Sequence, residues 1–334
     1  MACLRVAVVQ GGPSAEAEVS RASAAAVAGA LGRAGHEPVR VELDRDLAAV
    51  LRAGSFDVAF PAVHGDVGED GSLQGLLEIL DLPYVGSGVL ASALAMDKRA
   101  ARLVFASEGL PIAPGVAFTR AHGATAELAR RAREAVGPAL VVKPAASGSA
   151  IGVTRIEARD PLEALEAAIE AAFGLSGTVI LERFARGAEA TCGVLDLGEP
   201  FALPPTEITA PNDAFYTYEA RYAPGRSVHA CPPPWPEGVI RRVQEAAVGA
   251  YRALGCRDLA RADFIVGDAD DPARVTLLEV NTLPGFTGTS LYPEAAAVHG
   301  LSFEALTSAL VQRAFDRGPS PRNAAVPLPA DPPT

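Results

Sequence analysis

Short apolar runs alternate with Ala-rich stretches over the first third of the chain. Residues 4–10 form an apolar run typical of a buried parallel strand, and residues 36–43 and 57–63 predict two more strands. An Ala-rich helix that reaches about Gly32 separates the first two strands, and Ser14 is a plausible cap for its start. Strand–helix alternation of this kind predicts a parallel sheet with helices on both faces.

Two Gly-containing turns follow strands of this predicted sheet. Gly11-Gly12 and His64-Gly65 both lie at carboxyl ends of strands, where ligands of such sheets bind, so they are expected to face one cleft. Residues 64–71 are polar and Gly-rich but lack EF-hand spacing, which favours a ligand-facing loop over a calcium site. Residues 86–91 match GxGxxA, yet their position away from the opening strand–helix unit favours a tight turn over a dinucleotide site.

A second unit spans residues 98–182. A helix is expected after Lys98, and strands are expected at 139–144 and 153–156. The small-residue loop 145–152 between these strands could bring backbone N–H groups to phosphate oxygens, with Lys143 as a point charge beside it. The loop is not a Walker A motif, and a plain hairpin turn fits it equally well.

The pattern after residue 258 predicts a hairpin with chemistry on one face. Residues 261–266 and 275–281 read as strands with a turn-rich segment between them. A hairpin centred on residue 271 pairs Asp263 with Glu279 and Arg261 with Asn281, because paired positions have a constant index sum. Opposed carboxylates repel unless a cation lies between them, and their hard oxygens suit Mg²⁺. The alternative is a solvated polar face closed by salt bridges from Arg261.

Length and charge narrow the class of protein. The chain has 334 residues, enough for two domains or three small ones, and 49% of them are hydrophobic, which fits a sizeable core. Its 29 basic and 40 acidic residues give a net charge of −11, which argues against nucleic-acid binding but not against a small anionic ligand.

Neither a membrane span nor a secretion signal is expected. No run reaches the roughly 18 apolar residues that a span needs, and the segment before the first strand is too short for a signal peptide. The four cysteines form no CxxC pair and are expected to be buried free thiols in a reducing cytoplasm. The sequence therefore predicts a cytoplasmic protein that contacts neither membrane nor nucleic acid.

Seven motifs in order resemble those of the D-alanine–D-alanine ligases of the ATP-grasp superfamily. The resemblance covers about residues 4–315. The motifs are GGPSAEAEVS (11–20), HGDVGEDGSLQG (64–75), MDK (96–98), Lys143-Pro144 with Gly148-Ser149, the lid segment FYTYEARY (215–222), ARADF (260–264) and EVNTLPGFTGTSLYP (279–293).

This resemblance implies an α/β fold of the ATP-grasp type. A doubly wound parallel-sheet domain stands at the N-terminus, and two α+β lobes hold ATP between them. The implied parts are a Rossmann-like substrate domain (1–95), a central lobe (96–181), a C-terminal lobe with metal and acceptor sites (182–317) and a disordered Pro-rich tail (318–334).

The resemblance also implies a reaction and a set of residues. ATP phosphorylates the carboxylate of one D-alanine, and the amine of a second D-alanine displaces phosphate to give D-alanyl-D-alanine for peptidoglycan precursors. The implied ATP contacts are Lys98, Lys143, Ser149, Glu182, Phe184, Glu189 and Arg221, and the implied ligands of two Mg²⁺ (or Mn²⁺) ions are Asp263, Glu279 and Asn281. A homodimer is implied by the family alone.

The substrate contacts follow in the same way. Glu16 and His64 would contact the first D-alanine, and Ser290 and the Leu291 N–H the carboxylate of the second. Arg261 and the Gly285 N–H would stabilise charge at the attacked carbon. The implied triad that closes the lid over the acyl phosphate is Glu16, Ser149 and Tyr222.

Some positions depart from the family. Ala146-Ser147 stands where the family usually has Arg-Glu, and Arg221 replaces a Lys. Tyr222 favours an amine acceptor, because the related D-alanine–D-lactate ligases use a His there. The rival hypotheses are a ligase with another acceptor (D-serine, D-lactate or a secondary-metabolite amino acid), an inactive nucleotide-binding regulator, and a dehydrogenase based on the GxGxxA match.

Overall fold

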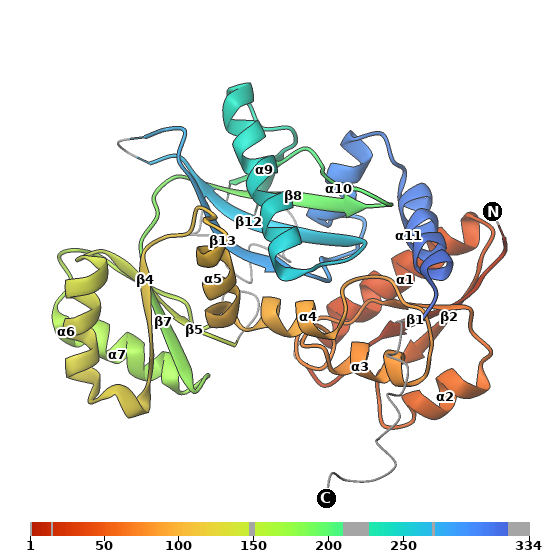
Figure 1. Ribbon diagram of the computed structural model, residues 1–334, viewed down its shortest axis with the longest axis horizontal. Helices are drawn as coiled ribbons and strands as arrows, with labels where there is room; N and C mark the ends of the chain where they lie inside the picture. Colours follow the sequence, from red (N-terminus) through yellow and green to blue (C-terminus); the bar gives the residue numbers. More distant parts are fainter. Residues whose placement is uncertain (1, 15, 147–150, 210–226, 269–270, 320–334) are drawn as a thin grey trace, which may run out of the picture.

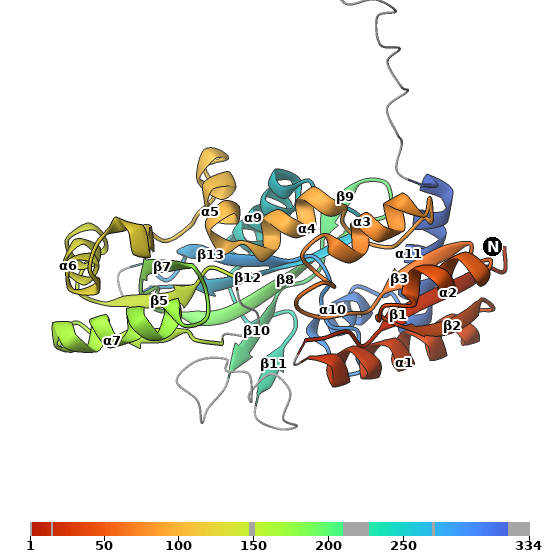
Figure 2. The same cartoon turned by 90° about the horizontal axis from the view of Figure 1, so that it is seen from below.

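Three sheets lie side by side along the long axis of the molecule (Figure 1). The computed structural model describes residues 2–14, 16–146, 151–209, 227–268 and 271–319. The central lobe lies at one end, the C-terminal lobe in the middle and the N-terminal sheet at the other end, and a view turned by 90° keeps this order (Figure 2).

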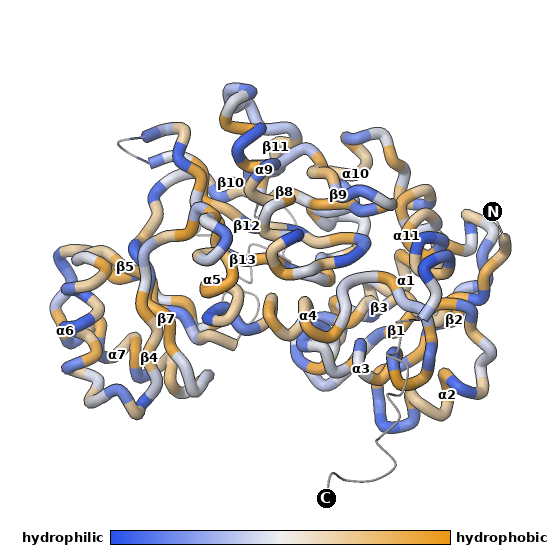
Figure 3. The backbone as a smooth tube through the Cα atoms, viewed as in Figure 1, coloured by the Kyte–Doolittle hydropathy of each residue, from blue (hydrophilic) through white to orange (hydrophobic). Residues whose placement is uncertain are grey.

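The N-terminal sheet is parallel, with strand order β2-β1-β3. Its elements are β1 (Arg5–Gln10), α1 (Ala17–Arg33), β2 (Glu37–Glu42), α2 (Leu47–Ala53), β3 (Val58–Pro61) and α3 (Ser72–Ile79). Val6 and Val8 of β1 pack with α1 on one face, whereas Ala7 and Val9 pack with α2 and α3 on the other. Both faces of the sheet are covered, as the strand–helix alternation predicts. The strands β1 and β3 are themselves mostly hydrophobic (Figure 3).

The central lobe is an antiparallel sheet with helices on one face. The elements that lead into it and form it are α4 (Val89–Met96), α5 (Lys98–Ser107), β4 (Gly115–Thr119), the 3₁₀ turn η1 (Arg120–His122), α6 (Thr125–Val136), β5 (Leu140–Pro144), β6 (Thr154–Ile156), α7 (Leu162–Phe173) and β7 (Thr178–Arg183). The strand order is β4-β7-β5-β6, and α6 and α7 cover the face that bears Val142 and Leu181. Side chains alternate along a strand, so Lys143 and Glu182 lie on the uncovered face.

The C-terminal lobe is a second antiparallel sheet. Its elements are β8 (Ala188–Asp196), β9 (Pro200–Ala202), β10 (Thr206–Thr209), β11 (Val228–Ala230), α9 (Glu237–Leu254), β12 (Leu259–Val266), β13 (Val275–Asn281), α10 (Leu291–Val298) and α11 (Phe303–Arg317). The strand order is β11-β10-β8-β12-β13, with β9 beside β8. Ala262 and Phe264 pack with α9 and α5, which leaves Arg261 and Asp263 on the opposite face.

Two sequence expectations are wrong in detail. Ser14 does not cap α1, because Glu16 is the N-cap residue and makes no side-chain cap; the Ser14 hydroxyl instead accepts from the Glu16 N–H and donates to the His64 carbonyl. Cys3 is exposed, while burial raises the pKa of Cys256 to about 12 and that of Cys192 further. Within the described ranges, no helix is long and apolar enough to span a membrane.

The last helix returns to the N-terminal sheet. Leu306 and Leu310 of α11 share a core with β1 and β3. At its end, Arg317 donates to Asp258 at 3.0 Å and to the Tyr84 carbonyl at 2.7 Å, and Asp258 also accepts from the Gly86 N–H at 2.8 Å. Asp258 is only 2% exposed, so its contacts with Arg317 and Gly86 are buried. These contacts connect the C-terminal lobe to the N-terminal one.

We expect Arg317→Met to lower the free energy of unfolding by about 3 kcal/mol, because it leaves Asp258 buried and without this guanidinium. Arg33→Met is the matched control, since the Arg33–Glu304 pair also joins α11 to the N-terminal part but is 62% and 37% exposed, and it should cost less than about 1 kcal/mol. Urea unfolding measures both. An equal loss of unfolding free energy in the two variants would contradict the stabilising role of the Arg317–Asp258 pair.

Candidate active site

The hairpin of β12 and β13 has the predicted register where the chemistry lies. Asp263 pairs with Glu279 and Arg261 with Asn281. The register then shifts by one, because Phe264 pairs with Leu277 and leaves Leu278 as the extra residue of a bulge. The prediction is therefore confirmed for the functional pairs and wrong for the rest of the hairpin.

Asp263 accepts hydrogen bonds from two neighbours. Arg261 donates to both of its oxygens, at 2.7 and 2.8 Å, and the Thr191 hydroxyl donates to Oδ1 at 2.9 Å. A carboxylate has about four acceptor sites, so these three bonds leave one for a further partner. The salt bridge from Arg261 that the alternative interpretation expects is present, and it is compatible with a cation bound at the remaining site.

Glu279 is paired with a lysine from a distant helix. Lys98 Nζ lies 3.0 Å from Glu279 Oε2. The MDK motif explains this placement: the Asp97 side chain caps α5 by accepting from the Arg99 and Ala100 N–H groups, so Lys98 is the first helical residue. The Lys98 N–H also donates to the Ala145 carbonyl, which brings the loop after β5 to the same place.

A second charge cluster, in addition to that of Lys98 and Glu279, surrounds the buried Glu182. Lys143 Nζ and Arg102 Nη1 each lie 2.7 Å from a different oxygen of the Glu182 carboxylate, which is 4% exposed. Burial alone raises the pKa of this carboxyl, but Lys143 and Arg102 outweigh burial and hold the pKa below its usual range. The carboxylate therefore stays ionised beside the predicted ATP lysine.

A composition signal for both lysines is present in the sequence. Lys98 and Lys143 are the two lysines among the 29 basic residues of the chain, the others being arginine. Lys98 pairs with Glu279 of the C-terminal lobe, and Lys143 pairs with Glu182 on the uncovered face of the central sheet. A lysine is a compact point charge and an arginine a planar fork, so these two positions are where the chain uses a point charge.

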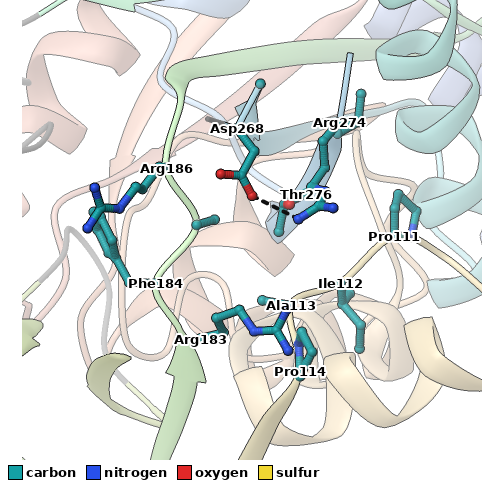
Figure 4. A pocket seen from close by; sticks show the side chains of 13 residues that line it. Pro111, Ile112, Ala113, Pro114, Arg183, Phe184, Arg186, Asp268, Arg274 and Thr276 are labelled. Carbon is teal, nitrogen blue, oxygen red and sulfur yellow. Dashed lines mark hydrogen bonds and ion pairs between the residues drawn. The ribbon is translucent and has the colours of Figure 1, made fainter. Parts of the chain in front are cut away.

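A pocket of about 310 Å³ lies at the hinge between the lobes (Figure 4). Both connections between the lobes, 111–114 and 183–186, line it together with the turn end of the β12–β13 hairpin. Phe184 points along one side of it, and Asp268 and Arg274 form an ion pair at 2.8 Å across from Arg183. The Arg155 guanidinium lies over the Phe184 ring, 4.0 Å from its centre.

The predicted contacts of the first substrate lie at the carboxyl ends of β1 and β3. Glu16 is buried, and its carboxylate approaches Gly65, where an added Cβ would lie 3.2 Å from Oε2. His64 is 6% exposed, with Nε2 3.2 Å from the Ser23 hydroxyl and Nδ1 3.4 Å from Glu69. Since protein groups engage both ring nitrogens, His64 shapes the loop that carries Gly65.

The predicted acceptor site is the start of α10. Ser290 is its N-cap residue and Leu291 its first helical residue, an arrangement that suits an anion. Gly285 lies against Ser290: an added Cβ there would lie 2.9 Å from the serine oxygen. Phe286 packs on Phe60 with ring centres 5.5 Å apart, which docks this segment beside the N-terminal sheet.

The remaining predicted residues divide into two groups. Glu189 of β8 pairs with Ile265 and lies on the face that bears Thr191 and Asp263. Ser149, Arg221 and Tyr222 lie outside the described residues, and with them the predicted lid and two of the three triad residues.

The oxygen donors fit a hard divalent cation. Glu279 and Asp263 contribute carboxylates and Asn281 an amide oxygen, which accepts from the Leu283 N–H at 2.9 Å and retains a second lone pair. Among the described residues, His, Cys, Asp and Glu alone form no group of three that could hold a metal. Two carboxylates and one amide oxygen suit a cation that takes its other ligands from water and phosphate oxygens.

Comparisons with known proteins show the family of the chain. Family profiles described as D-ala D-ala ligase C-terminus and N-terminus match residues 104–312 and 48–87. A D-alanine–D-alanine ligase of Desulforudis audaxviator is 45% identical over 94% of this chain and 99% of its own length, and one of Anaeromyxobacter dehalogenans is 45% identical over 93% and 96%.

Solved structures give the same result. The D-alanine–D-alanine ligase of Bacillus anthracis matches with a TM-score of 0.80 and 30% identity over 94% of this chain and 98% of that one. The same enzyme complexed with ATP matches with a TM-score of 0.79 and 28% identity over the same shares. The chain therefore belongs to the D-alanine–D-alanine ligase family, whose members are ATP-dependent ligases.

Proposed function

We propose that the site joins two D-alanine molecules through an acyl phosphate. A carboxylate oxygen of the first D-alanine attacks the γ-phosphorus of ATP, and the bond to ADP breaks. The amine of the second D-alanine then attacks the acyl carbon, the bond to phosphate breaks, and the amine loses its proton. The observation that carries this proposal is the convergence of Lys98 with Glu279 and of Asp263 with Arg261 and Thr191, a cation-and-carboxylate surface suited to a terminal phosphate.

The ATP contacts follow from the two charge clusters. Lys98 and Lys143 neutralise phosphate oxygens, while Glu182 and Phe184 lie on the nucleobase side and Glu189 on the ribose side. Asp263, Glu279 and Asn281 would hold Mg²⁺ or Mn²⁺. When bound, such ions neutralise charge on the phosphoryl group that is transferred.

The substrate contacts lie between the N-terminal sheet and α10. Glu16 binds the ammonium group of the first D-alanine, and His64 maintains the adjoining loop. The N-terminus of α10, with Ser290 and the Leu291 N–H, receives the carboxylate of the second. Arg261 and the Gly285 N–H stabilise the negative charge that develops at the attacked carbon.

The product suits peptidoglycan precursor synthesis in the cytoplasm, and we propose that the enzyme acts there as a homodimer. Ile79 at the end of α3 and Leu90 at the start of α4 are 74% and 71% exposed, which makes them candidates for the subunit contact. Sedimentation equilibrium tests this: Leu90→Glu should shift the mass from dimer to monomer. A wild-type monomer would refute the dimer.

The acceptor is tested with purified protein, ATP, Mg²⁺ and a panel of D-amino and D-hydroxy acids. D-alanine is expected to give ADP and dipeptide in equal amounts and to be the best acceptor, in line with the relatives named above. Preference for D-lactate or D-serine would replace the acceptor but keep the chemistry. ATP binding without phosphate release for any D-amino acid would refute a ligase.

A further inference from the structure

Arg102 joins three parts of the hinge. It lies one turn after Lys98 on α5, and its side chain is 12% exposed. Nη1 donates to Glu182 Oε1 at the end of β7, and Nη2 donates to the Ala113 carbonyl in the first connection between the lobes, both at 2.7 Å. One planar group thus fixes the carboxylate and the linker relative to each other.

Lys143 and Arg102, the two cations on Glu182, differ in whether they can move away from this carboxylate. Lys143 donates to Oε2, and at the proposed ATP site a bound triphosphate would draw this amine away from the carboxylate. Arg102 is also held by Ala113 and has no such role, so it stays on Oε1. Without it, Glu182 would become a buried carboxylate whose lysine is engaged elsewhere, and such a group takes up a proton.

We propose that Arg102 is a positioning residue that keeps the Glu182 carboxylate ionised and oriented when Lys143 turns to the phosphates. Arg102 thereby sets the affinity for ATP and the preference for a nucleobase with an exocyclic amino group. This inference rests on the proposed ATP site. An ionised carboxylate can only accept hydrogen bonds, so it pairs with an amino group and repels a keto oxygen. A protonated carboxyl can also donate to the keto oxygen.

The test compares Arg102→Met with Arg102→Lys, and uses Arg99→Met, an exposed arginine on the same helix, as control. Binding of ATP and of inosine triphosphate, its 6-keto analogue, is measured by calorimetry, and steady-state kinetics are measured in parallel. Arg102→Met should weaken ATP binding about 10- to 100-fold, the effect of losing a hydrogen bond to a buried charge. It should also reduce the ratio of the affinity for ATP to the affinity for inosine triphosphate. The kcat and the KM for D-alanine should stay within about twofold of the wild-type values.

Two further readouts separate this role from a merely structural one. Arg102→Lys keeps the charge but loses the fork, so it should restore part of the ATP affinity. In Arg102→Met, the ATP preference should return as the pH rises and Glu182 ionises; the groups that face this carboxyl are Lys143, Lys98 and residue 102. Unchanged ATP binding and preference in Arg102→Met, or equal losses for both nucleotides at every pH, would overturn the proposal. Nucleotide binding is measured directly, so the role of Arg102 is tested even if the wild-type protein binds ATP without ligating. That result would refute the proposed function but not the role of Arg102.

Discussion

Glu279→Gln is expected to lower kcat/KM for ligation by about 10³-fold and to leave the fold intact, because charge stabilisation by a bound cation supplies several kcal/mol and each 1.36 kcal/mol is a factor of ten. Glutamine keeps the shape and one oxygen donor but removes the charge that faces Lys98 and Asp263. The backbone pairing of Glu279 with Asp263 does not depend on that charge, so circular dichroism and the unfolding midpoint should change little.

The control for this variant is Glu245→Gln on the outer face of α9. It makes the same chemical change at a side chain that is 69% exposed and 3.9 Å from Arg241, and it should keep wild-type activity. A coupled assay for ADP, run with Mg²⁺ and with Mn²⁺, measures both variants. Activity of Glu279→Gln near that of the control would remove Glu279 from the metal site.

Lys143→Met is expected to lower kcat/KM for ATP by about 10²-fold, because a fixed positive charge on the phosphates is lost. The same change takes one of two cations from Glu182, whose pKa then rises towards the value that burial favours. Lys143→Arg should recover less than its charge implies, since a fork cannot replace a point charge that alternates between Glu182 and phosphate.

The scarcity of lysine gives an independent measurement. Lys98 and Lys143 carry the side-chain amines of the chain, so an amine-directed reagent reports on this site and on the N-terminus. ATP with Mg²⁺ should protect both lysines from labelling, as followed by peptide mass spectrometry. Labelling of Lys143 at the same rate with and without saturating ATP would contradict its role.

The sequence predicts those parts of the site that depend on local spacing. Strand alternation and the central turn suffice to place Asp263 opposite Glu279 and Arg261 opposite Asn281. The bulge at Leu278 is not predicted, because pairing by a constant index sum assumes that neither strand has an extra residue. The pattern does contain its trace, since the alternation of Val275 and Leu277 changes phase before Val280. The register error does not reach the functional pairs, since it begins after Asp263.

Contacts between distant elements are beyond such reasoning. Nothing in the spacing shows that Arg102 reaches Glu182, because the pair joins α5 to β7 and depends on how the lobes pack. Ser14 has a typical cap residue type, but tertiary structure uses its hydroxyl to bind the loop at His64. His64 is similar: the motif predicts a substrate contact, and the fold engages both ring nitrogens with Ser23 and Glu69.

The most direct test of phosphoryl transfer at this site follows oxygen atoms. D-alanine labelled with ¹⁸O in its carboxylate is incubated with ATP, Mg²⁺ and the enzyme, and the released phosphate is analysed by mass spectrometry. Because the acyl carbon parts from an oxygen that began in the carboxylate, the phosphate should carry a single ¹⁸O for each dipeptide formed. Dipeptide formed together with unlabelled phosphate would show that the carboxylate is never phosphorylated, and would contradict the mechanism.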